Sequence, residues 1–498
     1  GQGSAMTTPA SRKGPFGGTC QPSRVPLLAP GSKRSTLPFP HPWNYQRPID
    51  ILESFFCDAD QLEGFGRHNR YVKLPGMDPV LVTRDPQMIR AITVNTGNKP
   101  GQFDRDTMPS TGIARATGED TLLYANGELW KHQRQLAASP FGKTSLFQPE
   151  KFQEFEETFR RTISERIAFL ERRLQELQQT SVEIPLEAEI KPVMLELLTN
   201  NFFSAEFDQQ ELRERFVPAL ERIIDHIVED TIMQRLGWLS GMFRRRSTLS
   251  DDLEAFEELT TRVLAARKTK RGLWSQFRSE APDELLRSNI KVFLAGALEA
   301  TTSFASWTIS HLARHPEVQK KVWEEICRVE HYTPDELNEA VYLGAVLDET
   351  LRLTPSLYFL PRRATEETAV QLSENQTCTL PKGTHVLLDV WHANRHEDHW
   401  GTAISGYPAE QFAPERWEFL AQQGANSKDR LHFGFGHGPR VCPGKHLGLL
   451  EVGLVVGGVV QAFELSAQGE NLPRAGVSTK PADGTRVKLT LRRPTVTT

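Results

Sequence analysis

The stretch FGFGHGPRVCPG, residues 433–444, places one cysteine at the end of a glycine-rich loop, with Arg440 two positions before it. The residues that follow, KHLGLLEVGLVVGGVVQAFEL (445–465), are almost continuously apolar and predict a buried helix. Cys442 therefore lies where a loop enters a helix N-terminus. Free N–H groups and the positive end of the helix dipole stabilise a thiolate there, so we expect an electron-rich sulfur with a low pKa.

The loop also carries features that suit a large flat ligand. Glycines at 434, 436, 438 and 444 allow close backbone approach, and Arg440 supplies a fixed cation for a carboxylate. A thiolate ligand, N–H groups that tune it and a nearby cation together describe an axial haem site. A lone cysteine is also often a small buried hydrophobic residue, so the surrounding residues have to decide between the two interpretations.

Five residues of this loop have the residue types and the spacing of one protein family's motif: Phe435, Gly438, Arg440, Cys442 and Gly444. This pattern resembles the haem loop of the cytochrome P450 family, in its soluble single-domain form, and the resemblance extends over most of the chain. It implies a mainly helical α+β fold with small sheets, in which haem b lies between a long distal helix and the helix that follows the cysteine. It also implies that Cys442 is the axial thiolate ligand of the iron, held by a loop that includes Phe435 and Gly444.

A second motif supports the resemblance. LDETLRL (347–353) places Glu349 and Arg352 three residues apart, on one face of a helix, which is also the spacing of an ordinary surface ion pair. The segment resembles the Glu-x-x-Arg motif of the family, and APERW (413–417) follows where the family has its third partner, Arg416. The resemblance implies a charge network that braces the haem loop.

The resemblance also implies a set of residues that bind the haem propionates. NGELWKHQR (126–134) contains Trp130 and Arg134 at the spacing of the family's propionate-binding helix. In LPRRATEE (360–367), counting back from Ala364 selects Arg362 rather than Arg363. We therefore expect Trp130, Arg134, Arg362 and Arg440 to bind the propionates; Trp130 alone would be a core residue.

The segment FLAGALEATTSFASWTISHLARHPE (293–317) is expected to cross the distal face of the haem. Glu299 is an acid within an apolar helix, so it needs a partner, water or a catalytic role. The family usually has a threonine directly after this acid, but a gap-free count from Trp307 places Ala300 there. Thr301 follows about 100° further around the helix. We expect proton delivery to depend on Glu299, on Thr301 if it can reach, on water or on a substrate hydroxyl.

The same resemblance indicates the substrate pocket, which is expected to be apolar. Its lining should come from the loop at 105–125, a lid at 236–246, the distal helix and the segment after the Glu-x-x-Arg helix. The individual residues expected there are Ile113, Ala297, Ala300, Leu357 and Tyr358. The lid sequence LGWLSGMFRRR combines aromatic and basic residues, which suits either membrane-surface contact or a solvated basic turn.

Composition limits the alternatives. The 498 residues carry a net charge of −4, which does not favour nucleic-acid binding, and the five cysteines are odd in number and widely spaced, which favours a reducing compartment. Residues 1–45 are irregular and proline-rich, and GQGSA before Met6 resembles an expression remnant; residues 46–498 form the expected catalytic domain. We expect a cytoplasmic monomer, or a membrane-associated protein if an N-terminal anchor has been removed.

The predicted activity is insertion of one oxygen atom from O₂ into a hydrophobic molecule. No Gly-rich dinucleotide fingerprint is present, so electrons are expected from a separate ferredoxin, reductase or NADPH-dependent reductase. Two alternatives stay open. The first is peroxide-driven or rearrangement chemistry on the same fold, with which Ala300 is compatible. The second is a haem-binding sensor without turnover; Glu299 in the distal helix counts against it, because a sensor needs no proton delivery.

Overall fold

The computed structural model describes most of the chain between the first strands and the C-terminal strand. The described residues are 12–13, 19–20, 56–58, 68–72, 80–96, 102–105, 116–118, 121–123, 125–141, 148–233, 249–269, 283–329, 340–424, 432–475 and 477–492.

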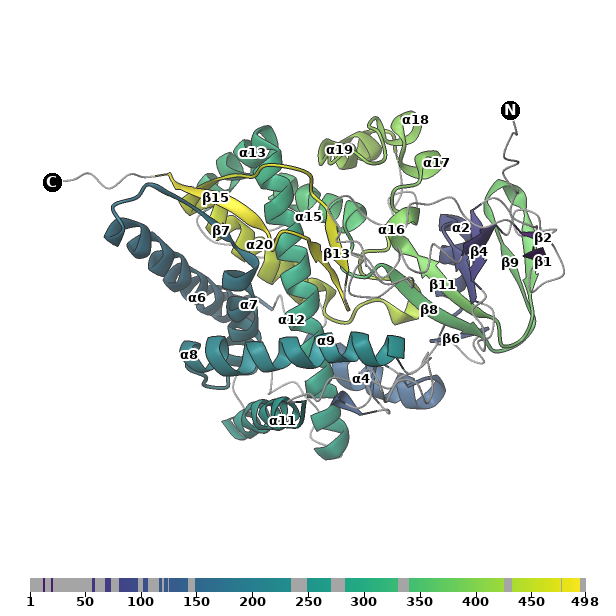
Figure 1. Cartoon of the computed structure of the whole chain (residues 1–498), viewed down its shortest axis with the longest axis horizontal. Helices are drawn as coiled ribbons and strands as arrows, with labels where there is room; N and C mark the ends of the chain where they lie inside the picture. The colour runs from purple at the N-terminus through teal and green to yellow at the C-terminus, as the bar shows by residue number, and fades with distance from the viewer. Residues whose placement is uncertain are drawn as a thin grey trace, which may run out of the picture.

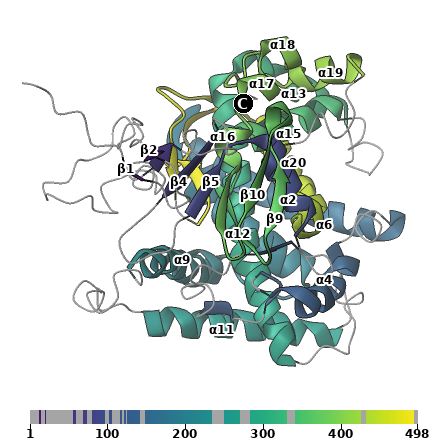
Figure 2. The ribbon, with the colours of Figure 1, turned by 90° about the vertical axis from the view of Figure 1, so that its right-hand side faces the viewer.

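The described part of the chain is mainly helical with small sheets, as the sequence predicts (Figure 1). The longer helices are α2 (Pro86–Val94), α4 (Gly127–Phe141), α6 (Pro149–Glu176), α7 (Glu187–Glu196), α9 (Val217–Met233), α11 (Leu249–Ala265), α12 (Asp283–Arg314), α13 (Pro316–Arg328), α15 (Val341–Leu353), α19 (Glu415–Gln422) and α20 (Lys445–Ala462). Shorter α-helices are α8 (Gln209–Glu211), α16 (Val390–Ala393), α17 (Glu397–Trp400) and α18 (Thr402–Ser405). Both views place α9 and α11 at the end of the molecule opposite α17, α18 and α19 (Figures 1 and 2).

The largest sheet joins strands from both halves of the chain. Its order is β3-β4-β5-β11-β8-β6, and β11 runs parallel to β5 while the other pairs are antiparallel. Its strands are β3 (Phe56–Asp58), β4 (Asn69–Val72), β5 (Val80–Thr83), β6 (Phe103–Arg105), β8 (Phe359–Ala364) and β11 (His385–Asp389). The sequence YVKLPGMDPVLVTRDP (71–86) alternates apolar and polar residues around a Pro-Gly pair and predicts a hairpin, which the antiparallel β4–β5 pair confirms.

The remaining strands form smaller sheets. β15 (Arg486–Leu491) lies between β12 (Phe463–Ser466) and β7 (Ser181–Pro185), and the C-terminal hairpin pairs β13 (Pro473–Ala475) with β14 (Thr479–Pro481). Two further pairs are β9 (Thr368–Gln371) with β10 (Thr377–Leu380), and β1 (Arg12–Lys13) with β2 (Thr19–Cys20). The sequence RVKLTL (486–491) predicts a strand, and β15 confirms it. The helix predicted for 445–465 was too long, because Phe463 already pairs with Leu491 in a sheet.

Helix α12 is the central element of the fold. It is apolar around most of its circumference, which is typical of a helix buried on all sides, and it packs against α7, α11, α15 and α20. Residues 301–313 are buried without interruption, and Trp307 is fully buried. This packing holds the middle of α12, which carries Glu299, in a fixed orientation relative to the cysteine loop.

Helix α20 is the one helix among the described residues that is long and apolar enough to cross a membrane. Two thirds of it (67%) is buried, and it packs against α6, α12, α13 and α15. It therefore serves here as a core helix that begins directly after the cysteine loop.

Candidate haem-binding site

The cysteine loop is fixed by its own backbone and by helix α2. The amide of Cys442 donates to the carbonyl of Phe435 at 2.8 Å, and the amide of Gly436 donates to Phe433 at 2.9 Å. Gly438 has a φ of 74°, and a Cβ atom there would lie 2.2 Å from the carbonyl oxygen of Thr93 in α2. Only glycine fits this position, because a side chain would displace the loop from α2.

We expected a low pKa for the Cys442 thiol, and this prediction was wrong for the chain without a bound metal. Burial raises the pKa of the thiol, and this outweighs the opposing effects of the Gly444 amide, Arg134 and Lys445. The helix dipole was overestimated because Cys442 precedes Lys445, the first residue of α20, by three positions. Coordination to a metal cation deprotonates a thiol outright, so a bound metal would be what makes this sulfur a thiolate.

Helix α12 presents a stripe of small residues toward this loop. Gly296, Ala300 and Phe304 follow one another at intervals of four and so share one face of the helix. The Phe304 ring meets the ring of Phe435 edge-on, with centroids 6.1 Å apart, so this face is directed at the cysteine loop. Gly296 and Ala300 are exposed although residues 301–313 of the same helix are all buried, and nothing lies within 4 Å of a Cβ built on Gly296. The stripe therefore leaves open space beside the loop.

Arg440 in the cysteine loop is half-buried against residues 122–130. Its guanidinium donates to the side chain of Asn126 at 2.7 Å and to the carbonyl oxygen of Ala125, and it stacks over the Trp130 ring at 4.6 Å. Burial and repulsion by Arg105, Arg362 and Arg134 lower its pKa to about 8, against the attraction of Asp104. The Nε atom of Arg440 is buried and has no hydrogen-bond partner among the described residues. This concentration of positive charge calls for an anionic ligand.

Strand β8 decides which of the two neighbouring arginines faces this cluster. Alternation along the strand buries Arg362 (3% exposed) and leaves Arg363 exposed, in agreement with the choice of Arg362. Arg362 Nε donates to Thr96 Oγ1 at 3.2 Å, and burial together with repulsion by Arg105 lowers its pKa to about 9. Arg134 lies near the sulfur, and burial lowers its pKa as well.

Comparison with known proteins agrees with this geometry. The model of the family described as "Cytochrome P450" matches residues 69–482. The chain belongs to the cytochrome P450 family. Members of this family are oxidoreductases that bind haem b through a cysteine thiolate and act as monooxygenases on hydrophobic molecules.

Curated relatives of this P450 include hydroxylases from distant organisms. It is 23% identical to cytochrome P450 52A3-B of Candida maltosa, covering 83% of this chain and 82% of the relative. It is 25% identical to cytokinin hydroxylase of Arabidopsis thaliana (84% and 81% covered) and 25% identical to steroid 17-alpha-hydroxylase/17,20 lyase of Gallus gallus (80% of each).

The residues of this P450 fit a haem. Cys442 would supply a sulfur ligand, and the stripe at Gly296 and Ala300 would leave room for a flat group. The Nε atom of Arg440, which has no hydrogen-bond partner among the described residues, lies in a cluster of mutually repelling arginines. Two propionates would supply counter-charge to this cluster. Phe435 and Gly444 support the loop, since Phe435 packs against both Phe304 and Gly448.

Glu299 does not point freely into the site. Its carboxylate is ion-paired with the Lys480 ammonium in β14 and accepts a hydrogen bond from Ser478 Oγ at 2.7 Å. Burial would raise the pKa of Glu299, but Lys480 and Ser478 outweigh it, so the pKa lies below its usual value. Sequence reasoning missed Ser478 and Lys480, because a lysine in a short C-terminal strand carries no periodic signal.

Residues 478–480 also attach the C-terminal hairpin to α12 and to the segment after α15. The Thr479 amide donates to Ser356 O at 2.7 Å, Trp307 Nε1 donates to Thr479 Oγ1 at 3.1 Å, and Thr479 Oγ1 donates to Pro355 O at 2.6 Å. The position of Lys480 relative to Glu299 is therefore fixed by several bonds.

The structure shows no break in α12 at Ala300, which agrees with the gap-free register. The Thr301 hydroxyl donates to the carbonyl of Ala297, one turn back, and the side chain is buried. Ser356, which the sequence did not indicate, places its hydroxyl 3.3 Å from the carbonyl oxygen of Ala300. Ser478 also contacts this part of the helix backbone, since its Oγ lies 3.5 Å from the carbonyl oxygen of Glu299.

The residues predicted to line the substrate pocket differ in their exposure. Ala297 is half-buried and Leu357 is 40% exposed, whereas Tyr358 is buried and stacks on Trp391 with centroids 4.7 Å apart, as a core residue does. Ile113 and the predicted lid at 236–246 lie outside the described residues.

The Glu-x-x-Arg prediction is confirmed by the geometry. Arg352 Nε donates to Glu349 Oε1 at 2.5 Å and Arg416 Nε donates to Glu349 Oε2 at 3.1 Å, and all three side chains are fully buried. Both arginines also donate to backbone carbonyls, among them Asn394 O, Ala409 O and Trp400 O. The network therefore fixes the segments that lead into the cysteine loop.

Glu451 in α20 gives the fold a pH dependence. Its side chain is buried, Oε1 has no hydrogen-bond partner among the described residues, and burial raises the pKa from 4.5 to about 8. The folded chain keeps this proton up to about pH 8, whereas the unfolded chain releases it near pH 4.5. The free energy of unfolding should therefore fall as the pH rises between these values, by about 5 kcal/mol from this group.

We expect the variant Glu451→Gln to lose this dependence. The urea midpoints of unfolding of variant and parent should be similar at about pH 5 and should diverge toward about pH 8, where the parent should unfold at a lower urea concentration. Parallel pH profiles for the two chains would show that Glu451 is not the buried proton carrier.

Proposed function

We propose that this P450 inserts one oxygen atom from O₂ into a hydrophobic organic substrate. Cys442 would bind the haem iron, and electrons would come from a separate protein donor. The observation that carries the proposal is the small-residue stripe of α12, whose face meets the cysteine loop at Phe435, together with the cluster of arginines around Arg440 in that loop. Haem b bound through a thiolate supplies the oxygen chemistry, since the thiolate donates electron density that favours O–O cleavage.

The chain's own residues would bind the cofactor, orient the substrate and exclude water. Arg362 and Arg440 would hold the two carboxylates of the cofactor; Trp130 stacks on Arg440, and Arg134 is close to the sulfur. Ala297 and Ala300 leave space for an apolar substrate on the distal side, and Leu357 is the exposed apolar residue after α15. The hydroxylase relatives support a substrate of this class.

Glu299 holds the carboxylate that we assign to proton delivery. Lys480 and Ser478 bind one of its oxygens, Oε2, so Oε1 is the oxygen available to exchange a proton with water. The hydroxyl of Thr301 can join this route only by leaving the carbonyl of Ala297. The route therefore starts from an ion pair rather than from the acid–threonine pair usual in the family.

The substrate test is a spectral titration of the purified protein with a library of apolar compounds. A compound that binds next to the iron should shift the Soret band, and it should also stimulate consumption of electrons and yield a product with one added oxygen. Electron consumption without any oxygenated product for every compound that shifts the band would contradict the proposal.

Variants of the distal helix test proton delivery. Glu299→Gln and Thr301→Ala should each lower the yield of product per electron pair about tenfold, with more peroxide released. Matched controls are Glu284→Gln, an exposed acid on the same helix, and Thr308→Ala, whose hydroxyl also donates to a carbonyl one turn back at 2.8 Å. Unchanged coupling in both test variants would place proton delivery elsewhere.

A second candidate function is peroxide-driven oxygen insertion or rearrangement. It is favoured by Ala300, which has no hydroxyl, and by the engagement of Thr301 with its own helix. Product formed from an organic hydroperoxide without any electron donor, at a rate that matches or exceeds the donor-dependent rate, would favour this second function.

A further inference from the structure

A cluster of histidines lies where the start of strand β4 meets helix α17. His68, directly before β4, and His396 and Asp398, at the start of α17, bring one possible ligand atom each to within 4.8 Å of one another. His396 Nε2 lies 3.0 Å from Nε2 and 3.3 Å from Nδ1 of His68. The two rings are packed at a centroid distance of 4.2 Å.

These atoms form a ligand set for a borderline transition-metal cation. Two imidazole nitrogens and a carboxylate oxygen are ligands that Zn²⁺ takes, and water can fill a fourth position. Tetrahedral ligands at roughly 2.1 Å from a zinc ion are roughly 3.4 Å from one another. The separations between His396 and His68 are already close to this value.

The backbone holds the ligands in place before any cation binds. The carbonyl of His68 accepts a hydrogen bond from the amide of Arg84 at 3.0 Å. The ring of His396 is oriented by its Nδ1, which accepts the amide hydrogen of Asp398 at 3.2 Å, so that Nε2 faces His68. A cation bound at Nε2 would shift the ring proton of His396 to Nδ1, which could then no longer accept the hydrogen bond from the Asp398 amide. Because this exposed hydrogen bond is lost when the cation binds, we expect modest rather than very tight binding.

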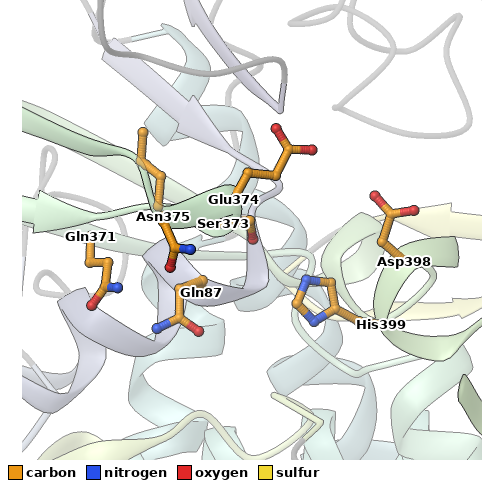
Figure 3. A pocket seen from close by; sticks show the side chains of 8 residues that line it. Gln87, Gln371, Ser373, Glu374, Asn375, Asp398 and His399 are labelled. Atoms are coloured by element: carbon orange, nitrogen blue, oxygen red, sulfur yellow. The ribbon is translucent and has the colours of Figure 1, made fainter.

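An open polar pocket borders the cluster at Asp398. The pocket has a volume of about 630 Å³, and its walls include Asp398, His399, Gln87 and residues 371–375. Figure 3 shows Asp398 and His399 on one side of the pocket and Gln87 with the residues of the β9–β10 turn on the other. His399 stands next to the cluster, with its ring centroid 5.1 Å from that of His396.

We propose that His68, His396 and Asp398 bind a divalent cation of the Zn²⁺ class, at a site separate from the haem site. The three residues lie outside the cysteine loop (433–444) and are not members of the arginine cluster. The bound cation would connect two segments that are 328 residues apart in sequence. Its effect would therefore be to tie the six-stranded sheet to α17 and to strengthen the fold.

The test uses the haem-loaded protein, stripped of other metals with a chelator and titrated with Zn²⁺ alone by calorimetry. We expect one Zn²⁺ per chain and a rise in the unfolding midpoint of about 3 °C at a hundredfold excess over the dissociation constant. His68→Ala, His396→Ala and Asp398→Asn should each weaken binding at least about tenfold. The exposed helix residue His132 provides the control, and His132→Ala should bind as the parent does.

Two outcomes would overturn the proposal. One is the absence of stoichiometric Zn²⁺ binding by the parent protein. The other is a dissociation constant that stays the same in all three ligand variants while their reduced carbonyl spectra show that they are folded with haem. Because Asp398→Asn keeps the size of the side chain and the amide at the start of α17, it keeps the test valid even if an alanine variant fails to fold.

Discussion

Cys442→Ser should fold and yet lose the strongly red-shifted Soret band of the reduced carbonyl complex. The position of that band depends on a thiolate opposite the carbonyl ligand, and a serine hydroxyl is a far weaker donor. Monooxygenase activity should fall to background for the same reason. Far-ultraviolet circular dichroism should stay close to that of the parent, because the neighbouring residues Val441 and Pro443 are unchanged and preserve the backbone conformation of the loop.

Cys327 provides the matched control for this variant. It is a free, exposed cysteine in α13, so Cys327→Ser removes one thiol without touching the loop, and its carbonyl spectrum should equal that of the parent. A red-shifted band retained in Cys442→Ser would mean that another side chain binds the iron, and the proposed chemistry would then have no basis.

Glu349→Gln should have the second largest effect, on folding rather than on chemistry. Two guanidinium groups, those of Arg352 and Arg416, are fully buried and share this one carboxylate. Removing one partner from a buried ion pair costs about 3–5 kcal/mol, because the remaining charge stays buried without compensation. We expect little haem-loaded protein after expression and a clearly lower unfolding midpoint of what remains.

A surface ion pair gives the comparison for Glu349→Gln. Glu183 and Arg486 join β7 to β15 at 2.7 Å, but both side chains are more than half exposed, at 59% and 54%. Solvent screening reduces the value of such a pair, so Glu183→Gln should leave haem content and the unfolding midpoint nearly unchanged. Equal losses in the two variants would show that the Glu349 network has no special structural role.

Much of the site could be predicted from short-range patterns. The choice of Arg362 over Arg363 came from a one-residue count, and alternation in β8 buries the residue that this count selects. The register that places Ala300 directly after Glu299 stays a prediction; it needs no gap, and α12 runs without a break through both residues. Such patterns are readable because a strand repeats every two residues and a helix about every 3.6 residues.

Other properties could not be predicted, since they depend on residues far apart in sequence. The low pKa expected for Cys442 followed from its position before a helix, but burial by the folded chain outweighs that effect. The ion pair of Glu299 with Lys480 spans 181 residues, and the contact of His68 with His396 spans 328. No local period connects such residues, and only the packing of the C-terminal hairpin and of α17 brings them together.

The sequence by itself determined the family, the identity of the proposed ligand Cys442, the Glu-x-x-Arg network and the course of the long helices, because each of these is written in spacings within a single element. The tertiary structure decided what surrounds those residues: the counter-ion of Glu299, the bond that engages Thr301, the buried proton of Glu451 and the charge of the arginine cluster. The physical reason is that desolvation and pairing depend on which distant segments exclude water from a group, and that is settled only when the whole chain has packed.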